Sequence, residues 1–373
     1  MKKVMVIIGT RPEAIKMFPV IMELKKHKEI KTVICSTGQH KEMLDSVFET
    51  FNINLDYNLN IMKKNQTLVY ISQMIMRKLP DVLNYEKPDI ALVHGDTNTT
   101  FIASLICFYM RIPIAHVEAG LRTYNITNPF PEEFNRQAVS LISMLNFVPT
   151  KVSKTNLINE QKNSESIILT GNTIVDTFKY TIKENYYHSE LHWCESDNLI
   201  IITTHRRENL GEPMRHMFRA IKKFLDENSN FKAVFPIHLN PQIRDIANKE
   251  FENCDNIHII EPLGLIDFHN FLNKAKIVLT DSGGIQEEAV SLGKQVLLLR
   301  ETTERPEGVE AGLIRLVGSD ENSIYDNLMD VSQNMESIIN LSKNKNIYGD
   351  GNASRKIVDK LLKVLLNNDY SRA

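Results

Sequence analysis

The sequence predicts an α/β protein of two domains, each built on a parallel sheet. Short apolar runs rich in branched residues recur along the 373 residues, and helical patterns separate them. This alternation is typical of parallel strands joined by crossover helices. A chain of this length can form about two domains, each with its own hydrophobic core.

The predicted strands fall into two groups of five. Those of the first half are KVMVII, KTVICS, DIALVH, IPIAHV and MLNFVP, and those of the second are LIIITT, KAVFPI, NIHII, KIVLT and QVLLL. Between the groups, residues 179–198 are polar and aperiodic toward their end, which is typical of a linker. The domains therefore cover 1–177 and 178–354, and the amphipathic pattern at the end predicts a helix within 355–373 that packs back on the first domain.

Composition excludes several classes of function. The net charge is −2, so no basic field favours nucleic acid or an anionic membrane. The longest apolar run after the first strand, ASLICFYM, is too short to span a bilayer, and the amino terminus reads as a strand and not as a signal peptide. Four widely spaced cysteines without a CxxC pair favour a reducing, cytoplasmic location.

A candidate phosphate site follows the strand KIVLT. Ser282, Gly283 and Gly284 stand where the next helix begins, so its first backbone N–H groups and positive dipole end would face a phosphate. Glu287 and Glu288 would repel phosphate, so at least one of them must face another group, such as ribose hydroxyls. An ordinary helix start with acids on its dipole explains the glutamates but not the paired glycines.

Acidic and histidine side chains gather after two neighbouring strands. His94 and Asp96 are two residues apart at the end of one strand, and His116 and Glu118 repeat the arrangement on the next. If strand geometry persists that far, each pair lies on one side of its strand, and ligands bind open α/β sheets at these ends.

A third acidic segment, FPEEFNRQ, adds Glu132, Glu133 and Arg136. Several carboxylates in one cleft separate one another's pKa values and can supply a base and an acid near neutral pH. A metal site of the metallophosphatase kind is disfavoured, because its further Asp, Asn and His motifs are missing. A purely structural alternative has buried histidines bonded to backbone and acids capping the following helices.

Cationic side chains follow three strands where anions would need them. Each group alone could be a solvated charge cluster, but the repeated placement at strand ends favours an anion clamp. The residues are Arg11, Lys16, His205, Arg206, Arg207, Arg300 and Arg305. No strand is followed by GxGxxG, so a bound NAD cofactor is not indicated.

The segments GTRPEAIKM, HGDT, HVEAGLRT, PEEFNR, GNT, THRRENLGEP, PIHLNP, TDSGGIQEEA and ERPEG resemble, in order and over nearly the whole chain, the non-hydrolysing UDP-N-acetylglucosamine 2-epimerase family. The resemblance implies a GT-B fold, in which two Rossmann-like domains with parallel sheets face a central cleft. It implies cytoplasmic interconversion of UDP-GlcNAc and UDP-ManNAc without a cofactor or metal. We also expect a homodimer.

The resemblance assigns roles to individual residues. It implies catalytic roles for Asp96, Glu118 and Glu132, with Arg136 and His205 close by. It implies binding of UDP and substrate by Arg11, Lys16, Phe268, Ser282, Gly283, Gly284, Glu288 and Arg305, in which Phe268 contacts uracil and Glu288 the ribose. It also implies an activating second substrate site that includes Gln39, Gln66, Glu132, Arg206 and His238, although Glu42 and Asn65 depart from the residues of some relatives.

The hydrogen on carbon 2 of the sugar is not beside a carbonyl, so removing it as a proton requires another electron sink. Departure of UDP from carbon 1 supplies one, giving a 2-acetamidoglucal to which UDP adds back. Three alternatives remain at this stage: a GT-B glycosyltransferase, a hydrolysing epimerase and a nucleotide-sugar-binding module.

Overall fold

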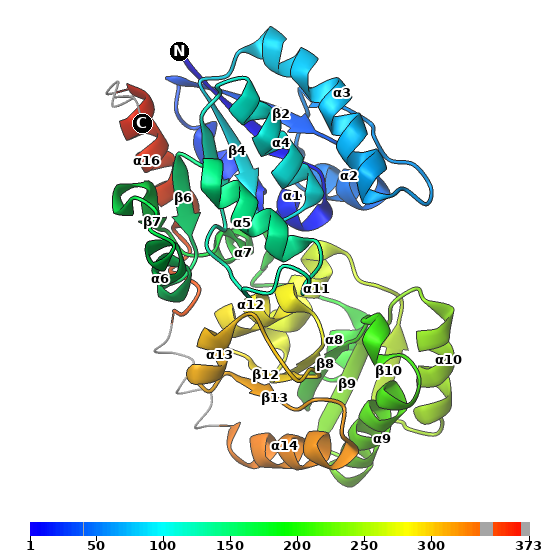
Figure 1. Ribbon diagram of the computed structural model, residues 1–373. Helices are drawn as coiled ribbons and strands as arrows, with labels where there is room; N and C mark the ends of the chain where they lie inside the picture. Colours follow the sequence, from blue (N-terminus) through cyan, green and yellow to red (C-terminus); the bar gives the residue numbers. More distant parts are fainter. Residues whose placement is uncertain (40, 336–345, 367–373) are drawn as a thin grey trace. The chain divides into compact units, whose positions relative to one another are not determined.

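The computed structural model describes residues 1–39, 41–335 and 346–366, with backbone alone at 41–43 and 207. The chain divides into two compact units, which are described separately (Figure 1). The first unit comprises Met1–Thr177 and the returning segment from Tyr348, and the second comprises Phe178–Ile347. The sequence predicts that the segment returning to the first domain begins at residue 355, whereas in the structure it begins at Tyr348. Among the described residues, no helix has the length and apolar character to cross a membrane.

The first unit is a parallel sheet of seven strands in the order β3-β2-β1-β4-β5-β6-β7. Its strands are β1 (Lys2–Ile8), β2 (Ile30–Ser36), β3 (Tyr57–Asn58), β4 (Ile90–His94), β5 (Ile114–Val117), β6 (Leu145–Val148) and β7 (Ile167–Leu169). Its helices are α1 (Arg11–Leu24), α2 (Lys41–Thr50), α3 (Leu68–Glu86), α4 (Asn98–Tyr109), α5 (Glu132–Ile142), α6 (Lys151–Asn159), α7 (Thr173–Thr181) and α16 (Ala353–Leu366). Helix α16, red in Figure 1, packs against α1.

The second unit is a parallel sheet of six strands in the order β10-β9-β8-β11-β12-β13. Its strands are β8 (Asn198–Thr203), β9 (Phe231–Pro236), β10 (Ile257–Ile260), β11 (Ile277–Thr280), β12 (Gln295–Leu298) and β13 (Ile314–Leu316). Its helices are α8 (Ser189–Trp193), α9 (Glu212–Glu227), α10 (Pro241–Glu250), α11 (Leu265–Lys274), α12 (Gly283–Ser291), α13 (Pro306–Glu310) and α14 (Glu321–Gln333).

The predicted fold class is confirmed, and all ten predicted strands are present. Three strands were missed because β3, β7 and β13 have only 2, 3 and 3 residues, too few for a periodic signal. The predicted linker at 179–198 was partly wrong, since α7 continues to Thr181 and the stretch contains α8. The predicted last helix is described as far as Leu366, and 367–373 lie outside the described residues.

Strand order reverses once in each sheet, and these reversals position the candidate sites. In the first sheet, β1 and β4 are neighbours, and the chain leaves them toward opposite edges of the sheet. In the second sheet, β8 and β11 are neighbours, and the chain again leaves them toward opposite edges. Loops that diverge in this way leave a crevice at the carboxyl ends of the strands, where α/β proteins bind ligands.

Glu86, the last residue of α3, fastens the edge of the first sheet. Its carboxylate pairs with Lys3 at 2.7 Å and Lys31 at 3.4 Å, and it accepts the hydroxyl of Tyr57 in β3 at 2.8 Å. The hydrogen bond from Lys3 is the main cause that lowers the pKa of Glu86 to about 2. The same carboxylate raises the pKa of Tyr57 to about 12. This cluster explains why a strand as short as β3 pairs at all.

Replacing Glu86 should change how stability depends on pH. The pKa of Glu86 falls from an ordinary 4.5 to about 2 on folding, so its stabilisation is complete above about pH 4.5 and is lost as pH falls toward 2. Glu86→Gln should therefore lower the urea midpoint at neutral pH, and its deficit against the parent should shrink near pH ~3. The exposed Glu49→Gln is the control. A deficit that stays constant over this range would contradict the prediction.

Candidate functional site

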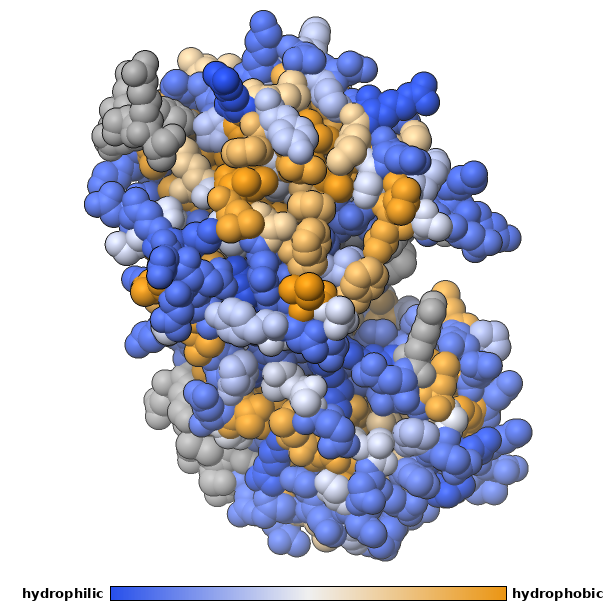
Figure 2. Space-filling model, viewed as in Figure 1, coloured by the Kyte–Doolittle hydropathy of each residue, from blue (hydrophilic) through white to orange (hydrophobic). Residues whose placement is uncertain are grey.

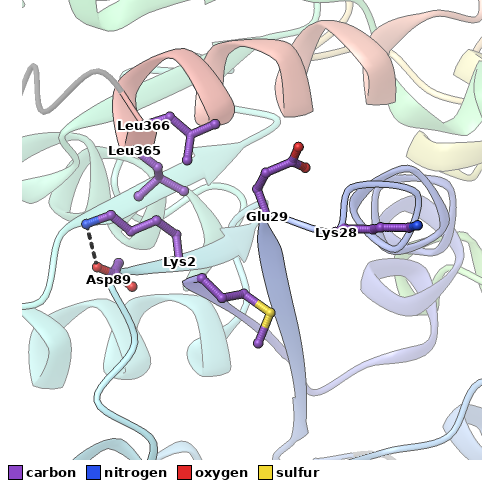
Figure 3. A pocket seen from close by; sticks show the side chains of 7 residues that line it. Lys2, Lys28, Glu29, Asp89, Leu365 and Leu366 are labelled. Atoms are coloured by element: carbon purple, nitrogen blue, oxygen red, sulfur yellow. Dashed lines mark hydrogen bonds and ion pairs between the residues drawn. The ribbon is translucent and has the colours of Figure 1, made fainter.

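A cavity of about 320 Å³ lies at the carboxyl ends of β1, β4 and β5 in the first unit. Among the predicted site residues, it is lined by Lys16, Gln39, Asp96, Glu118 and Glu132. A larger hollow of about 670 Å³ lies where β1 begins and is lined by Lys2, Asp89 and the end of α16 (Figure 3). Because parallel α/β proteins bind ligands at the carboxyl ends of their strands, the smaller cavity is the candidate functional site.

Glu118 is more enclosed than Asp96 among the candidate catalytic acids. Its side chain is 9% exposed, forms an ion pair with Lys16 and lies 3.7 Å from Nε2 of His94. Oε2 also accepts a hydrogen bond of 3.1 Å from Nδ2 of Asn172. The Glu118 backbone is left-handed, with φ of 63°, a costly conformation for a residue other than glycine. It turns the carboxylate out of the strand and into the cavity.

Asp96 is held by a cationic side chain from α5. Nη2 and Nε of Arg136 donate to its Oδ2 at 2.8 and 3.0 Å, while the Asp96 side chain remains 23% exposed. Arg136 also contacts buried Glu133 at 3.3 Å. Glu133 accepts backbone N–H groups from Thr123 and Tyr124. Burial alone would raise the pKa of Glu133, but these bonds, Gln137 and Arg136 lower it.

Glu13 is a buried acid of this site that the sequence reasoning missed. Its two oxygens accept five hydrogen bonds, from the N–H groups of Gly9 and Thr10 and the hydroxyls of Thr10, Thr97 and Thr100. Burial raises the pKa of Glu13, and the hydrogen bonds oppose that effect. The motif TRPE is a Thr-x-x-Glu capping box and could have drawn attention to it.

The sequence places each histidine and the acid two residues later on one side of a strand if strand geometry persists to the acid, and this condition is not met, although His94 and Asp96 line the same cavity. Gly95 and Glu118 both have positive φ, so the extended geometry ends before either acid is reached. His94 instead approaches Glu118 from the neighbouring strand. His116 is fully buried, its Nε2 lies 2.7 Å from the carbonyl of Gly95, and burial lowers its pKa to about 4. This matches the structural alternative for His116.

Gln39 and Gln66, predicted for a second substrate site, lie together in the first unit. Nε2 of Gln66 donates to the carbonyl of Gln39 at 2.8 Å, and Oε1 of Gln39 accepts the hydroxyl of Thr99. Asn65 has a positive φ, and the Glu42 side chain lies outside the described residues. Arg11 is the partly buried first residue of α1.

The glycine turn of the second unit begins α12, as the sequence predicts. Ser282 is the N-cap residue with extended backbone, and its N–H donates to the hydroxyl of Thr280. A Cβ at Gly283 would lie 3.0 Å from Nη1 of Arg305, whereas at Gly284 nothing lies within 4 Å. The space beside the helix start at Gly284 is therefore open.

The two glutamates of α12 face different neighbours. Glu287 is buried and pairs with Nε of Arg305 at 2.6 Å, and Glu304 contacts Nη1 of Arg305, also at 2.6 Å. Glu288 lies 3.7 Å from Nε2 of buried His269 on α11, the helix that carries Phe268. Arg305 thus has two carboxylate partners inside the unit.

Asp281 organises the loop after β8, and the sequence reasoning gave it no role. This buried carboxylate accepts the N–H groups of His205 and Arg206 and the amide of Asn209, and it lies 3.2 Å from Nδ1 of His205. Burial alone would raise the pKa of Asp281, but His205 and the backbone donors lower it.

His238 stands close to this loop. Its ring lies 6.2 Å from that of His205 between centroids, and burial followed by His205 lowers its pKa. The side chain of Arg207 lies outside the described residues, and Arg300 pairs with Glu304. Within the described parts of the chain, no group of three or more His, Cys, Asp or Glu residues could hold a metal ion.

Two units with parallel α/β sheets, together with the similar solved structures, place the chain in the GT-B fold class. The profile of the family UDP-N-acetylglucosamine 2-epimerase matches residues 22–362. The chain belongs to this family and is an isomerase.

Relatives and solved structures agree with this assignment. The chain is 51% identical over 360 residues to the UDP-N-acetylglucosamine 2-epimerase of Bacillus subtilis (strain 168), covering 96% of this chain and 95% of the relative. It is similar to the S. aureus MnaA-UDP co-structure, with TM-score 0.91 and 46% identity over 100% and 99% of the two chains. The Neisseria meningitidis UDP-GlcNAc 2-epimerase bound to UDP-GlcNAc has TM-score 0.88 and 46% identity over 97% and 100%.

Proposed function

We propose that this protein interconverts UDP-GlcNAc and UDP-ManNAc by eliminating UDP and adding it back. The single observation that carries the proposal is the cavity of the first unit, where Asp96, Glu118 and Glu132 meet Lys16. An enzyme that moves a proton on either face of a sugar needs at least two such groups. The family membership and the UDP-GlcNAc bound to the N. meningitidis relative support the substrate.

The reaction requires an electron sink, and the diphosphate is the one that the substrate carries. A carboxylate takes the proton from carbon 2, and the C–H electron pair becomes the double bond between carbons 1 and 2. The bond from carbon 1 to oxygen breaks, and its electron pair leaves with UDP. In the reverse step the diphosphate oxygen attacks carbon 1 of the glycal, and carbon 2 accepts a proton on the opposite face.

The charges around the carboxylates suit this chemistry. Lys16 compensates Glu118, and Arg136 fixes Asp96 through two donors, so each acid is oriented before substrate arrives. Glu132 opens the first turn of α5 and lines the same cavity. We assign the sugar to this cavity and the proton transfers to these three acids.

We assign the nucleotide to the second unit, with the diphosphate at the start of α12 and the ribose at Glu288. The open space at Gly284 and the unpaired N–H groups expected at a helix start support this. We place Phe268 against the uracil and His205 near the departing diphosphate. Because Glu287 and Glu304 engage Arg305, its proposed contribution to the diphosphate is long-range charge and orientation of the turn.

The wider role follows from the reaction. We propose that the protein acts in the cytoplasm and supplies ManNAc-type sugars for cell-surface polysaccharide. We also propose that a second substrate molecule activates it through Gln39, Gln66, Arg206 and His238, of which the first two are in contact and the last lies beside His205.

We further propose a homodimer. Large apolar side chains lie exposed on α4 and α5, and Figure 2 shows orange atoms gathered over these helices. They include Phe108, Tyr109, Phe134 and Leu141, which are 52%, 72%, 46% and 74% exposed. Contiguous apolar patches of this kind mark protein interfaces.

Sedimentation tests the proposed dimer. It should give twice the chain mass for the parent and the chain mass for Leu141→Glu, because a charge in the apolar patch would separate the two copies. A parent that sediments as a single chain would exclude the dimer.

Incubation with UDP-GlcNAc in deuterated water tests the reaction and the carboxylates together. The parent should place deuterium at carbon 2 of both epimers and release neither UDP nor free sugar as a product. Asp96→Asn, Glu118→Gln and Glu132→Gln should bind UDP but lose about 10²- to 10⁴-fold in turnover, the usual worth of general acid–base catalysis. The rate of hydrogen–deuterium exchange at carbon 2 is measured separately with UDP-GlcNAc and with UDP-ManNAc as the starting epimer.

Each competing function gives a different result in the same experiment. Free ManNAc with released UDP would indicate a hydrolysing epimerase, and no label at carbon 2 would indicate a glycosyltransferase or a binding module. Turnover of all three folded variants within about threefold of the parent would refute the carboxylate assignment.

Gly284→Val tests the nucleotide turn. The added side chain would occupy the open space beside the helix start, so UDP affinity should fall at least tenfold, about 1.4 kcal/mol. Calorimetric titration with UDP measures it, and the thermal midpoint of Gly284→Val without UDP is the control for folding. Equal UDP affinity in the parent and in Gly284→Val would exclude this turn as the phosphate-binding site.

A further inference from the structure

We propose that Asn172 is a positioning residue that holds the carboxylate of Glu118 in its working orientation. The inference rests on the proposed function, because it gives a partner to a carboxylate that the proposal makes catalytic. Asn172 is 3% exposed and lies immediately before α7, in the motif GNT.

The hydrogen bonds of Asn172 determine which way its amide points. Its Oδ1 accepts the backbone N–H of Ile174 at 3.0 Å, which caps the start of α7. A backbone N–H can only donate, so the oxygen must face it and Nδ2 must face the other side. There Nδ2 donates to Oε2 of Glu118 at 3.1 Å. The donor is thus supplied in one orientation only.

Asn172 and Lys16 hold the same oxygen of Glu118. Lys16 on α1 forms an ion pair with Oε2, and Nδ2 of Asn172 donates to Oε2 from α7. His94 approaches this oxygen from β4 at 3.7 Å. With these groups at Oε2, the carboxylate is fixed although its backbone is in a strained left-handed conformation. We take Oε1 as the oxygen that faces substrate.

The backbone of Asn172 is itself fastened by the returning segment of the chain. Its N–H donates to the carbonyl of Tyr348 at 2.7 Å. A Cβ added at Gly349 would lie 2.9 Å from Cα of Gly171, so the two backbones meet where only glycine fits. Asp176 of α7 accepts the first N–H groups of α16, from Ala353 and Ser354. These contacts with the returning segment fix the start of α7, and they therefore fix the position of Asn172 beside Glu118.

Two substitutions separate this role from that of a helix cap. Asn172→Asp keeps the cap, because Asp is as good an N-cap as Asn, but sets a second carboxylate against Glu118. Asn172→Ser also keeps a capping oxygen but has no donor that reaches Glu118. Asn163→Asp is the matched control, since Asn163 caps the exposed 3₁₀ turn Ser164–Ser166 and has no contact with the cavity lining.

The test measures kcat and KM for UDP-GlcNAc, thermal midpoint and carbon 2 exchange from each epimer. Loss of a hydrogen bond to a charged group should lower kcat about 10- to 100-fold in Asn172→Ser and further in Asn172→Asp, with KM within about threefold. The midpoint should fall only slightly in Asn172→Ser and clearly in Asn172→Asp, which buries a second carboxylate against Glu118. The ratio of the two exchange rates should shift as it does in Glu118→Gln and not as in Asp96→Asn. Asn163→Asp should match the parent.

Three results would overturn the inference. If Glu118→Gln is inactive while Asn172→Asp keeps kcat within about twofold, Asn172 does not position the acid and the proposed function stands. If Asn172→Ser loses thermal midpoint and slows both exchanges equally, the residue is only a cap. If the parent does not exchange carbon 2, or Glu118→Gln stays active, the proposed function fails and this inference with it.

Discussion

Buried carboxylates that bind the loops at strand ends are the constraint on which both candidate sites depend. Glu13, Glu133 and Asp281 are at most 1% exposed, and each accepts several backbone or side-chain donors from a loop that follows a strand. Such loops have N–H groups with no partner in the sheet, and leaving them buried and unpaired would cost about 1–3 kcal/mol each. One carboxylate satisfies several of them and fixes the loop.

The acids of the first unit therefore have two distinct tasks. Glu13 and Glu133 are enclosed and bonded to loops, whereas Asp96 and Glu132 remain partly exposed in the cavity. The two sets are connected, since Glu133 contacts Arg136 and Arg136 binds Asp96. Adjacent positions in the sequence, Glu132 and Glu133, have opposite tasks because successive residues of α5 point to different sides.

The sequence predicted the parts of the fold that depend on periodicity and chain direction. Ten strands and the placement of Asp96 and Glu118 in one cavity followed from apolar runs and from the rule that parallel strands end at one edge. The ion pair of Lys16 with Glu118 was not predicted, because Lys16 was assigned to anion binding. It could not predict the turn at Gly95 or the left-handed Glu118, which broke the assumed histidine–acid pairs. The roles of Asp281 and Asn172 were also hidden, because they depend on loops distant in sequence.

The position of an isotope within the diphosphate reveals whether UDP leaves the sugar during epimerisation. UDP-GlcNAc is prepared with oxygen-18 in the bridge between carbon 1 and the β-phosphorus, and the mixture is followed by phosphorus NMR as the epimers form. If UDP is eliminated and re-added, rotation of the free terminal phosphate before re-addition moves label into its non-bridging positions. Complete epimerisation with all the label still in the bridge is the contrary result, because a released UDP with a rotating terminal phosphate would have moved the label.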